Sequence, residues 1–160
     1  MFWEYCAPRL RSMICDAQTY SKHPSFIGTE QFLIAVAIRK DADLSKLFAK
    51  YEITAEKIKK TLVDDQEIQE CVNPMPKLGA PPLFTLKAKA VLHGALDTAK
   101  QAKCTYIDIP HILFAVIAEV HCQAYKILAK MLGEKIFSFI IDICALVNSL
   151  PKKWPADLKK

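Results

Sequence analysis

The sequence predicts an all-α protein made of two tandem, pseudo-symmetric four-helix repeats. Three observations support this fold class. Of the 160 residues, 52% are hydrophobic, which is enough to build a core. Only four glycines occur against nine prolines, and stretches rich in Ala, Leu, Ile and Lys favour helices joined by short connections. Apolar residues recur at helical spacing, and one such pattern occurs twice, 80 residues apart.

Four helices are predicted in the first half of the chain. In the first of them, Leu10, Met13 and Ile14 recur at helical spacing. The second is apolar on nearly every side, which predicts a helix buried from several directions. The third is short and amphipathic, and Thr54 is the predicted N-cap of the fourth. The four predicted ranges are residues 8–22, 28–40, 44–51 and 53–65.

A change in composition separates the two halves. Residues 64–82 contain four prolines and a glycine, which predicts a linker. After it the scheme restarts with a long amphipathic helix, for which Thr85 is the predicted N-cap. The four predicted ranges in this half are residues 84–103, 108–120, 123–132 and 134–150. The predicted organisation is a first repeat (1–63), a Pro-rich linker (64–82), a second repeat (83–150) and a basic tail (151–160).

The repeat can be counted directly. At an offset of 80, residues 26–50 match residues 106–130 at seven of 25 positions, and several further positions exchange one apolar residue for another. One helix pair cannot bury such wide apolar faces, so we expect the two repeats to pack into a single compact domain. The identical positions are Ile27, Leu33, Ala35, Val36, Lys46, Ala49 and Lys50.

Charge and hydropathy exclude two classes of partner. The net charge is +5, but the last nine residues carry four lysines and one aspartate, so the remaining body is close to neutral. No basic stripe with interleaved aromatics is present, and we expect no nucleic acid as partner. The longest apolar run, residues 136–147, is too short to span a bilayer, so we expect no membrane partner. No signal peptide is visible at the start, which predicts a cytoplasmic protein.

No motif of catalysis or metal binding is found. The six cysteines form no CxxC pair, and no His pair has metal-ligand spacing, so we expect no metal and no cofactor. The thiols are predicted to be reduced and mostly buried. A Walker motif and a nucleophile elbow are absent, so we expect no enzyme. A small Cys-dependent enzyme is a further alternative, because Cys104, His111 and Cys122 lie close in sequence.

The two copies of the buried helix differ at their first residues, “GTE” in one and “DIP” in the other. Thr29 is predicted to cap the first copy, and Glu30 to complement the helix dipole in its first turn. In the second copy Asp108 is the predicted cap, Pro110 fits the first turn, and His111 is expected to bond locally. Two interpretations remain open: capping alone, or capping together with a carboxylate that binds a guanidinium or lysine of a client.

The stretch “IGTEQFLIAVAI” and the longer “FTLKAKAVLHGALDTAKQAKCTYIDIPHILFAVI” resemble the Clp N-terminal repeat, which occurs as a tandem pair at the head of Clp-type AAA+ unfoldases. The resemblance covers about residues 5–147. The stretches “KHPSFIGTE”, “PPLFT” and “PHILFAVIAEV” are also similar to the stand-alone Clp accessory subunits of plastids (the ClpT type), which consist of the double repeat without an ATPase.

The resemblance implies a non-catalytic protein-interaction module of the Clp unfoldase/protease system that recruits substrates or adaptors. An accessory subunit that docks on the Clp protease core, and stabilises or regulates it, is the alternative. The implied partners are proteins: Clp ATPase or protease subunits, adaptors, and unfolded or tagged clients. The plastid relatives imply the stroma as an alternative location, with a transit peptide that this chain does not show.

The resemblance also points to residues. In some bacterial relatives the Glu of each “GTE” contacts a phosphorylated arginine of the substrate; Glu30 keeps this letter, and Pro110 stands at the second position. A paired site of this kind is therefore not expected. The candidate protein-binding residues are Thr29, Glu30, Asp108 and His111.

Overall fold

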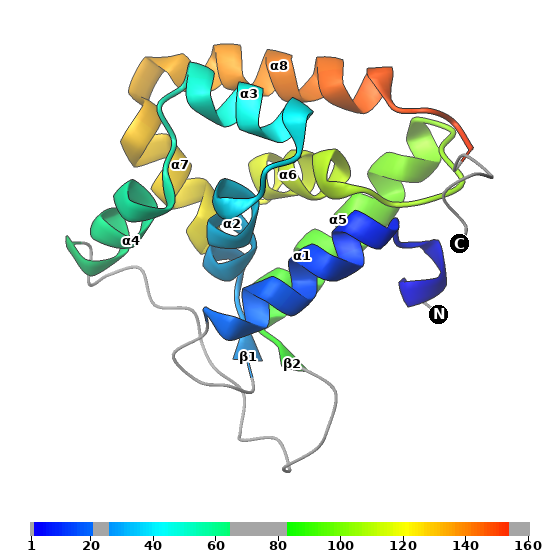
Figure 1. Cartoon of the computed structure of the whole chain (residues 1–160), viewed down its shortest axis with the longest axis horizontal. Helices are drawn as coiled ribbons and strands as arrows, with labels where there is room; N and C mark the ends of the chain where they lie inside the picture. Colours follow the sequence, from blue (N-terminus) through cyan, green and yellow to red (C-terminus); the bar gives the residue numbers. More distant parts are fainter. Residues whose placement is uncertain (1, 21–25, 65–82, 154–160) are drawn as a thin grey trace.

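The computed structural model describes residues 2–20, 26–64 and 83–153. The all-α prediction is confirmed, because α-helices account for nearly all the regular structure of these residues (Figure 1). In chain order the helices are α1 (Pro8–Thr19), α2 (Thr29–Ile38), α3 (Ala42–Lys50), α4 (Ala55–Asp64), α5 (Leu86–Gln101), α6 (Ile109–Ala118), α7 (Gln123–Leu132) and α8 (Ile136–Ser149). Two short 3₁₀ helices, Phe2–Tyr5 and Gly133–Lys135, precede α1 and α8.

The helix borders agree with the predicted ranges to within a few residues at most ends. Helix α4 runs to Asp64, one residue into the predicted linker, and the rest of that linker lies outside the described residues. Only residues 151–153 of the predicted basic tail are described. The division into repeats 1–63 and 83–150 stays a prediction, although α1–α4 and α5–α8 follow one another in the predicted order.

Helices α2 and α6 form the centre of the molecule (Figure 1). They lie between α3 and α8 on one side and α1 and α5 on the other. Seven of the ten residues of α2 and eight of the ten of α6 are buried, which confirms that these two helices are covered from several directions. Their apolar sequences are thus explained by their central position.

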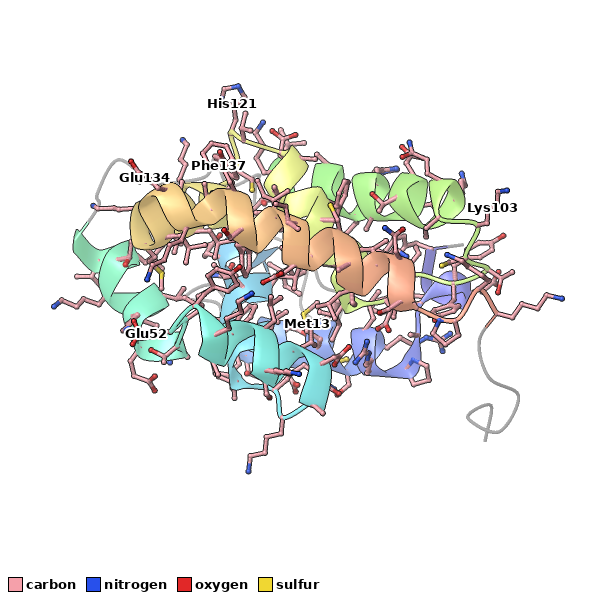
Figure 2. All side chains as sticks on the ribbon, turned by 90° about the horizontal axis from the view of Figure 1, so that it is seen from above. Met13, Glu52, Lys103, His121, Glu134 and Phe137 are labelled. Carbon is pink, nitrogen blue, oxygen red and sulfur yellow. The ribbon has the colours of Figure 1, made fainter. Side chains whose placement is uncertain are left out.

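A single hydrophobic core joins the two halves. Met13 of α1 and Phe32 of α2 are fully buried with Phe139 of α8, and Figure 2 shows Met13 in the interior. The Phe48 and Phe139 rings, from α3 and α8, lie 6.4 Å apart between centroids. Each such buried side chain stabilises the fold by about 1.5–3 kcal/mol relative to exposure. The buried residues of the two halves thus belong to one cluster.

Two short strand pairings cross between the halves, and the all-α prediction did not include them. Strand β1 (Phe26–Ile27) pairs in parallel with β2 (Leu83–Phe84), and an isolated bridge joins Cys6 to Ile107. Next to each pairing, the N-cap residue of the following helix donates a further backbone hydrogen bond to the other half. The N-cap residue of α5 donates its N–H to the Ile27 carbonyl at 3.0 Å, and that of α1 donates to the Ile107 carbonyl at 2.8 Å.

Within the described part of the chain, no single helix combines the length and hydropathy of a membrane span. The segments Ile109–Ala118 and Gln123–Ser149 pass by length and composition only as a pair, with a bend of 84° between them.

Candidate protein-interaction site

The four predicted site residues lie in two pairs at equivalent positions of the two halves. Thr29 and Glu30 begin α2, and Asp108 and His111 flank the beginning of α6. The 80-residue offset relates Gly28 to Asp108 and Gln31 to His111. The two helix starts can therefore be compared atom by atom.

At the start of α2, the predicted cap is wrong. Gly28 is the N-cap, and its N–H donates to Gln31 Oε1 at 2.7 Å. Thr29 is fully buried in the first turn, and its Oγ1 accepts a hydrogen bond of 3.1 Å from the N–H of Ala124. Because Ala124 lies in the first turn of α7, the Thr29 hydroxyl satisfies a free N–H group of a different helix, 95 residues away.

Glu30 is the second residue of α2 and is partly exposed, in the predicted first turn. Its side chain folds back over the N-cap: a Cβ added to Gly28 would lie 2.7 Å from Glu30 Oε1 and 2.8 Å from its Cδ. A residue with a side chain at position 28 would therefore displace the carboxylate. The negative charge is favourable here because it faces the positive end of the helix dipole.

At the start of α6, the predicted cap is confirmed. Asp108 Oδ1 accepts from the N–H of Ile109 at 2.8 Å, and the N–H of Asp108 donates to His111 Nδ1 at 3.0 Å. The local bond expected for His111 is thus present. Because Nδ1 is an acceptor, the neutral ring carries its proton on Nε2. The imidazole is fully buried, and burial lowers the pKa of His111.

Sequence reasoning missed the strongest polar contact at this helix start. The Arg9 guanidinium, from α1, donates to both oxygens of Asp108 at 2.7–2.9 Å and to both oxygens of Asp43 at 2.9 and 3.1 Å. The Asp108 side chain is only 3% exposed and that of Arg9 22%. No spacing signal could reveal this cluster, because Arg9 is 34 and 99 residues from its partners.

The two aspartates hold Arg9 in its charged form. Burial by itself would lower the pKa of Arg9, but the hydrogen bonds to Asp108 and Asp43 outweigh it and raise that pKa. Burial would likewise raise the pKa of Asp43, and its hydrogen bonds with Arg9 lower it instead. The cluster connects α1, α3 and the start of α6.

The outward face of α8 is apolar. Phe137 and Ile141, one helical turn apart, are 71% and 67% exposed, and Figure 2 shows Phe137 pointing away from the body. The 80-residue offset places Lys57 and Thr61 of α4 at the equivalent positions. This exposed apolar pair is therefore a property of the second half and not of the repeat as such.

Two of the five cysteines in the described residues are buried. Cys6 is buried, and its pKa is raised to about 12 by that burial, so the thiol cannot supply a thiolate at neutral pH. Cys122 is also buried, with its Sγ donating to the Val116 carbonyl. Cys15 is exposed, so it does not follow the prediction of mostly buried thiols. Among the described residues no group of His, Cys, Asp or Glu could hold a metal ion.

Comparisons with known proteins agree with this architecture. The family described as “Clp repeat (R) N-terminal domain” matches residues 83–158. The N-terminal domain of the caseinolytic protease associated chaperone ClpD from Arabidopsis thaliana has a similar fold, with a TM-score of 0.72 and 18% sequence identity. This similarity covers 93% of the present chain and 98% of the ClpD domain. No curated protein sequence matches the chain significantly.

The family match covers the second half, including β2 and the starts of α5 and α6. The fold match extends over both halves, because it covers 93% of this chain. The second half therefore matches the Clp repeat family, and the chain as a whole has the fold of a Clp N-terminal domain.

Proposed function

We propose that this chain recruits substrates or adaptors for a Clp unfoldase/protease, and that the Glu30 carboxylate contacts a basic group of the bound protein. The observation that carries the proposal is the position of Glu30. Glu30 is partly exposed, although its Oε2 atom is buried, and it lies on a backbone held by the β1–β2 pairing and by the Gly28–Gln31 bond. A fixed carboxylate of this kind suits a planar guanidinium, which donates two parallel hydrogen bonds.

The resemblance to bacterial relatives supports a client carrying a phosphorylated arginine. Only the α2 start keeps the glutamate of that motif, because Pro110 stands at the equivalent position in α6. The proposal is therefore a single contact of this type for each chain. Thr29 takes part indirectly, since its hydroxyl binds the N–H of Ala124 and so fixes the start of α2 against α7.

The test is the affinity for a client protein phosphorylated on arginine, measured by fluorescence anisotropy for the wild type and for Glu30→Gln. Glu134→Gln is the matched control, because Glu134 is exposed and lies in the 3₁₀ turn before α8 (Figure 2). We expect Glu30→Gln to weaken binding about tenfold or more, since a hydrogen bond to a charged group contributes about 1.5–3 kcal/mol. Unchanged affinity with intact helicity would reduce Glu30 to a residue of the first helical turn.

Gly28→Ala provides an independent arm of the same test. The backbone of Gly28 is extended, with φ −96° and ψ 176°, so alanine is tolerated there. Its Cβ displaces the Glu30 carboxylate without removing it. We expect a loss of affinity comparable to that of Glu30→Gln. Retention of full affinity would show that the folded-back position of Glu30 is not the binding position.

The alternative role is an accessory subunit that docks on the Clp protease core. The exposed pair Phe137 and Ile141 favours it, because an apolar face on one repeat only is typical of a surface used for association. Capture of Clp protease subunits from native lysate by the wild type, and its loss in Phe137→Ser, would support this role. Equal capture by the wild type and by Phe137→Ser would exclude this face of α8 as the docking surface. Either role places the chain where its Clp machine works, in the cytoplasm or, for a plastid-type subunit, in the stroma.

A further inference from the structure

Three segments that are far apart in the sequence meet at one end of the molecule. They are the 3₁₀ helix Phe2–Tyr5, the turn that follows α5 and the residues that follow α8 (Figure 1). The N–H of Ile107 donates to the Tyr5 carbonyl at 2.6 Å, and the N–H of Thr105 donates to the Lys152 carbonyl at 2.8 Å. Backbone hydrogen bonds therefore hold the three segments side by side.

Exposed cations gather on these segments and on the adjoining turns of α1 and α5. Arg11 is held there by a bond of 3.1 Å from its Nε to the Cys6 carbonyl, and Figure 2 shows Lys103 at the same end. Among the described residues, none of these cations forms an ion pair. We call this group the basic end, and its members are Arg11, Lys100, Lys103, Lys152 and Lys153.

The charge of the basic end is not balanced locally. Glu4 and Asp97 are exposed on the same segments, so five cations against two acids leave an excess of three positive charges. Asp108 adds nothing to this balance, because its side chain is 3% exposed and is bound by Arg9. More than half of the net charge of +5 thus lies at one end. Like charges repel one another at close range, so an anionic partner is favoured here.

Two aromatic side chains border the basic end. Trp3 is 39% exposed and Tyr5 50%, and the Trp3 ring meets that of Phe2 edge to face, with 6.5 Å between centroids. Exposed Trp and Tyr are enriched at protein interfaces, because each buries a large apolar area and keeps a polar group. We propose that the basic end binds an acidic segment of a partner protein, with carboxylates on the cations and an apolar residue on Trp3 and Tyr5. This surface is separate from Glu30 and does not depend on its proposed role.

A protein segment fits this surface better than a nucleic acid does. The next cations back along α5, Lys89 and Lys87, are about three helical turns before Lys100, and Lys87 is paired with Glu119. The basic end is therefore short, whereas a phosphate backbone is bound along an extended basic stripe. Lysine ammonium groups act as point charges, so each can bind a separate carboxylate.

Fluorescence anisotropy with a labelled peptide of glutamates and leucines tests the proposal on the full chain. We expect Lys103→Glu with Lys152→Glu to weaken binding about tenfold or more, and added salt to weaken binding to the wild type, because the cations are exposed. Lys46→Glu with Lys60→Glu is the matched control, since both lysines are exposed on α3 and α4 and the change in net charge is the same. Equal losses in the two variants would overturn the proposal, because the peptide would then respond only to net charge.

Three companion measurements define the ligand. The same peptide with glutamine in place of glutamate should not bind, and equal binding of both peptides would overturn the proposal. A labelled oligothymidine should bind more weakly than the acidic peptide, and tighter binding would overturn the proposal in favour of a nucleic acid. Glu30→Gln should leave the affinity for the acidic peptide unchanged, so a failure of this proposal is distinguishable from a failure of the proposed role of Glu30.

A neutral variant and a local reporter complete the test. Lys103→Gln with Lys152→Gln replaces the charge-reversed variant if that one does not fold, with an expected loss of about threefold or more. In a Trp154→Phe background Trp3 is the only tryptophan of the chain. The bound peptide should shift its emission to shorter wavelength. Binding without any change in Trp3 emission would place the peptide elsewhere and overturn the proposal.

Discussion

The starts of α2 and α6 meet the same structural requirement with different residues. In both, the third helical residue accepts a hydrogen bond from the N-cap N–H, through Gln31 in one and His111 in the other. In both, one carboxylate lies at the N-cap, from Glu30 or from Asp108. The duplication has thus kept the backbone geometry and the local charge, while the side chains that provide them have changed.

The difference lies in what the carboxylate serves. Asp108 is almost fully buried, caps its own helix and binds Arg9, so its carboxylate contributes to the stability of the fold. Glu30 is partly exposed, and the N–H of the N-cap residue Gly28 donates to Gln31. We therefore expect the fold to depend less on the carboxylate of Glu30 than on that of Asp108. The comparison therefore predicts opposite effects of mutation on stability and binding.

The largest effect is expected for Asp108→Ala. This change removes the cap of α6, worth about 1 kcal/mol, and leaves Arg9 with only Asp43 in a mostly buried position. Breaking a buried ion pair from one side costs about 3–5 kcal/mol, and the partial exposure of Arg9 favours the lower value. Glu30→Ala should cost less than about 1 kcal/mol, the contribution of an acidic group at a helix N-terminus. Urea denaturation followed by circular dichroism measures both, and equal losses would remove the distinction between the two starts.

The sequence predicted most of the helices and part of the site, for identifiable reasons. Helical periodicity is local, so the helix order was correct, and so were the caps Thr54 and Thr85, whose hydroxyls accept from N–H groups three residues later. The Thr29 prediction failed because its hydroxyl binds a helix 95 residues away. The contacts of Arg9 with Asp43 and Asp108 could not be predicted from the sequence, because these residues are 34 and 99 positions away from Arg9.

The strand pairings and the charge at the α6 start were missed for related reasons. Each strand has two residues, too few to show the alternation by which strands are recognised. Pro110 stands 80 residues after Glu30, so the sequence alone indicates that the second helix start has no carboxylate. In space, the carboxylate of Asp108 lies beside the N-cap of α6, as the carboxylate of Glu30 lies beside the N-cap of α2.

The next effect concerns pH and separates Gln31 from His111. Burial lowers the pKa of His111 below its ordinary value of 6.5, so the unfolded chain binds a proton that the folded chain refuses. The contribution of this residue to stability is therefore unchanged above pH 6.5 and is lost as the pH falls below that value, by up to about 1.4 kcal/mol per pH unit. His111→Gln copies the other helix start, with an amide oxygen as acceptor.

We expect His111→Gln to lose less stability than the wild type between pH 6.5 and pH 5, as measured by urea denaturation at each pH. Gln31→His is the reciprocal variant and should introduce an acid-dependent loss at the start of α2. If wild type and His111→Gln show parallel pH profiles, the buried imidazole does not contribute to acid sensitivity, and the two starts are equivalent in this respect.

The smallest effect tests the ends of the third helices, where the halves also differ. A residue with positive φ follows each of them: Glu52 (φ 54°) after α3 and Gly133 (φ 54°) after α7. Glycine adopts this conformation without strain, whereas a residue with a side chain pays about 1 kcal/mol or more. Glycine also loses more entropy on folding, by about 0.4–1 kcal/mol, so Glu52→Gly should stabilise the protein by only about 0.5 kcal/mol. Gly133→Ala has open space around its Cβ, so the expected loss of about 1 kcal/mol comes from the backbone alone. Thermal midpoints of the two variants should therefore move in opposite directions, and a shift of the same sign would mean that the two turns do not share this constraint.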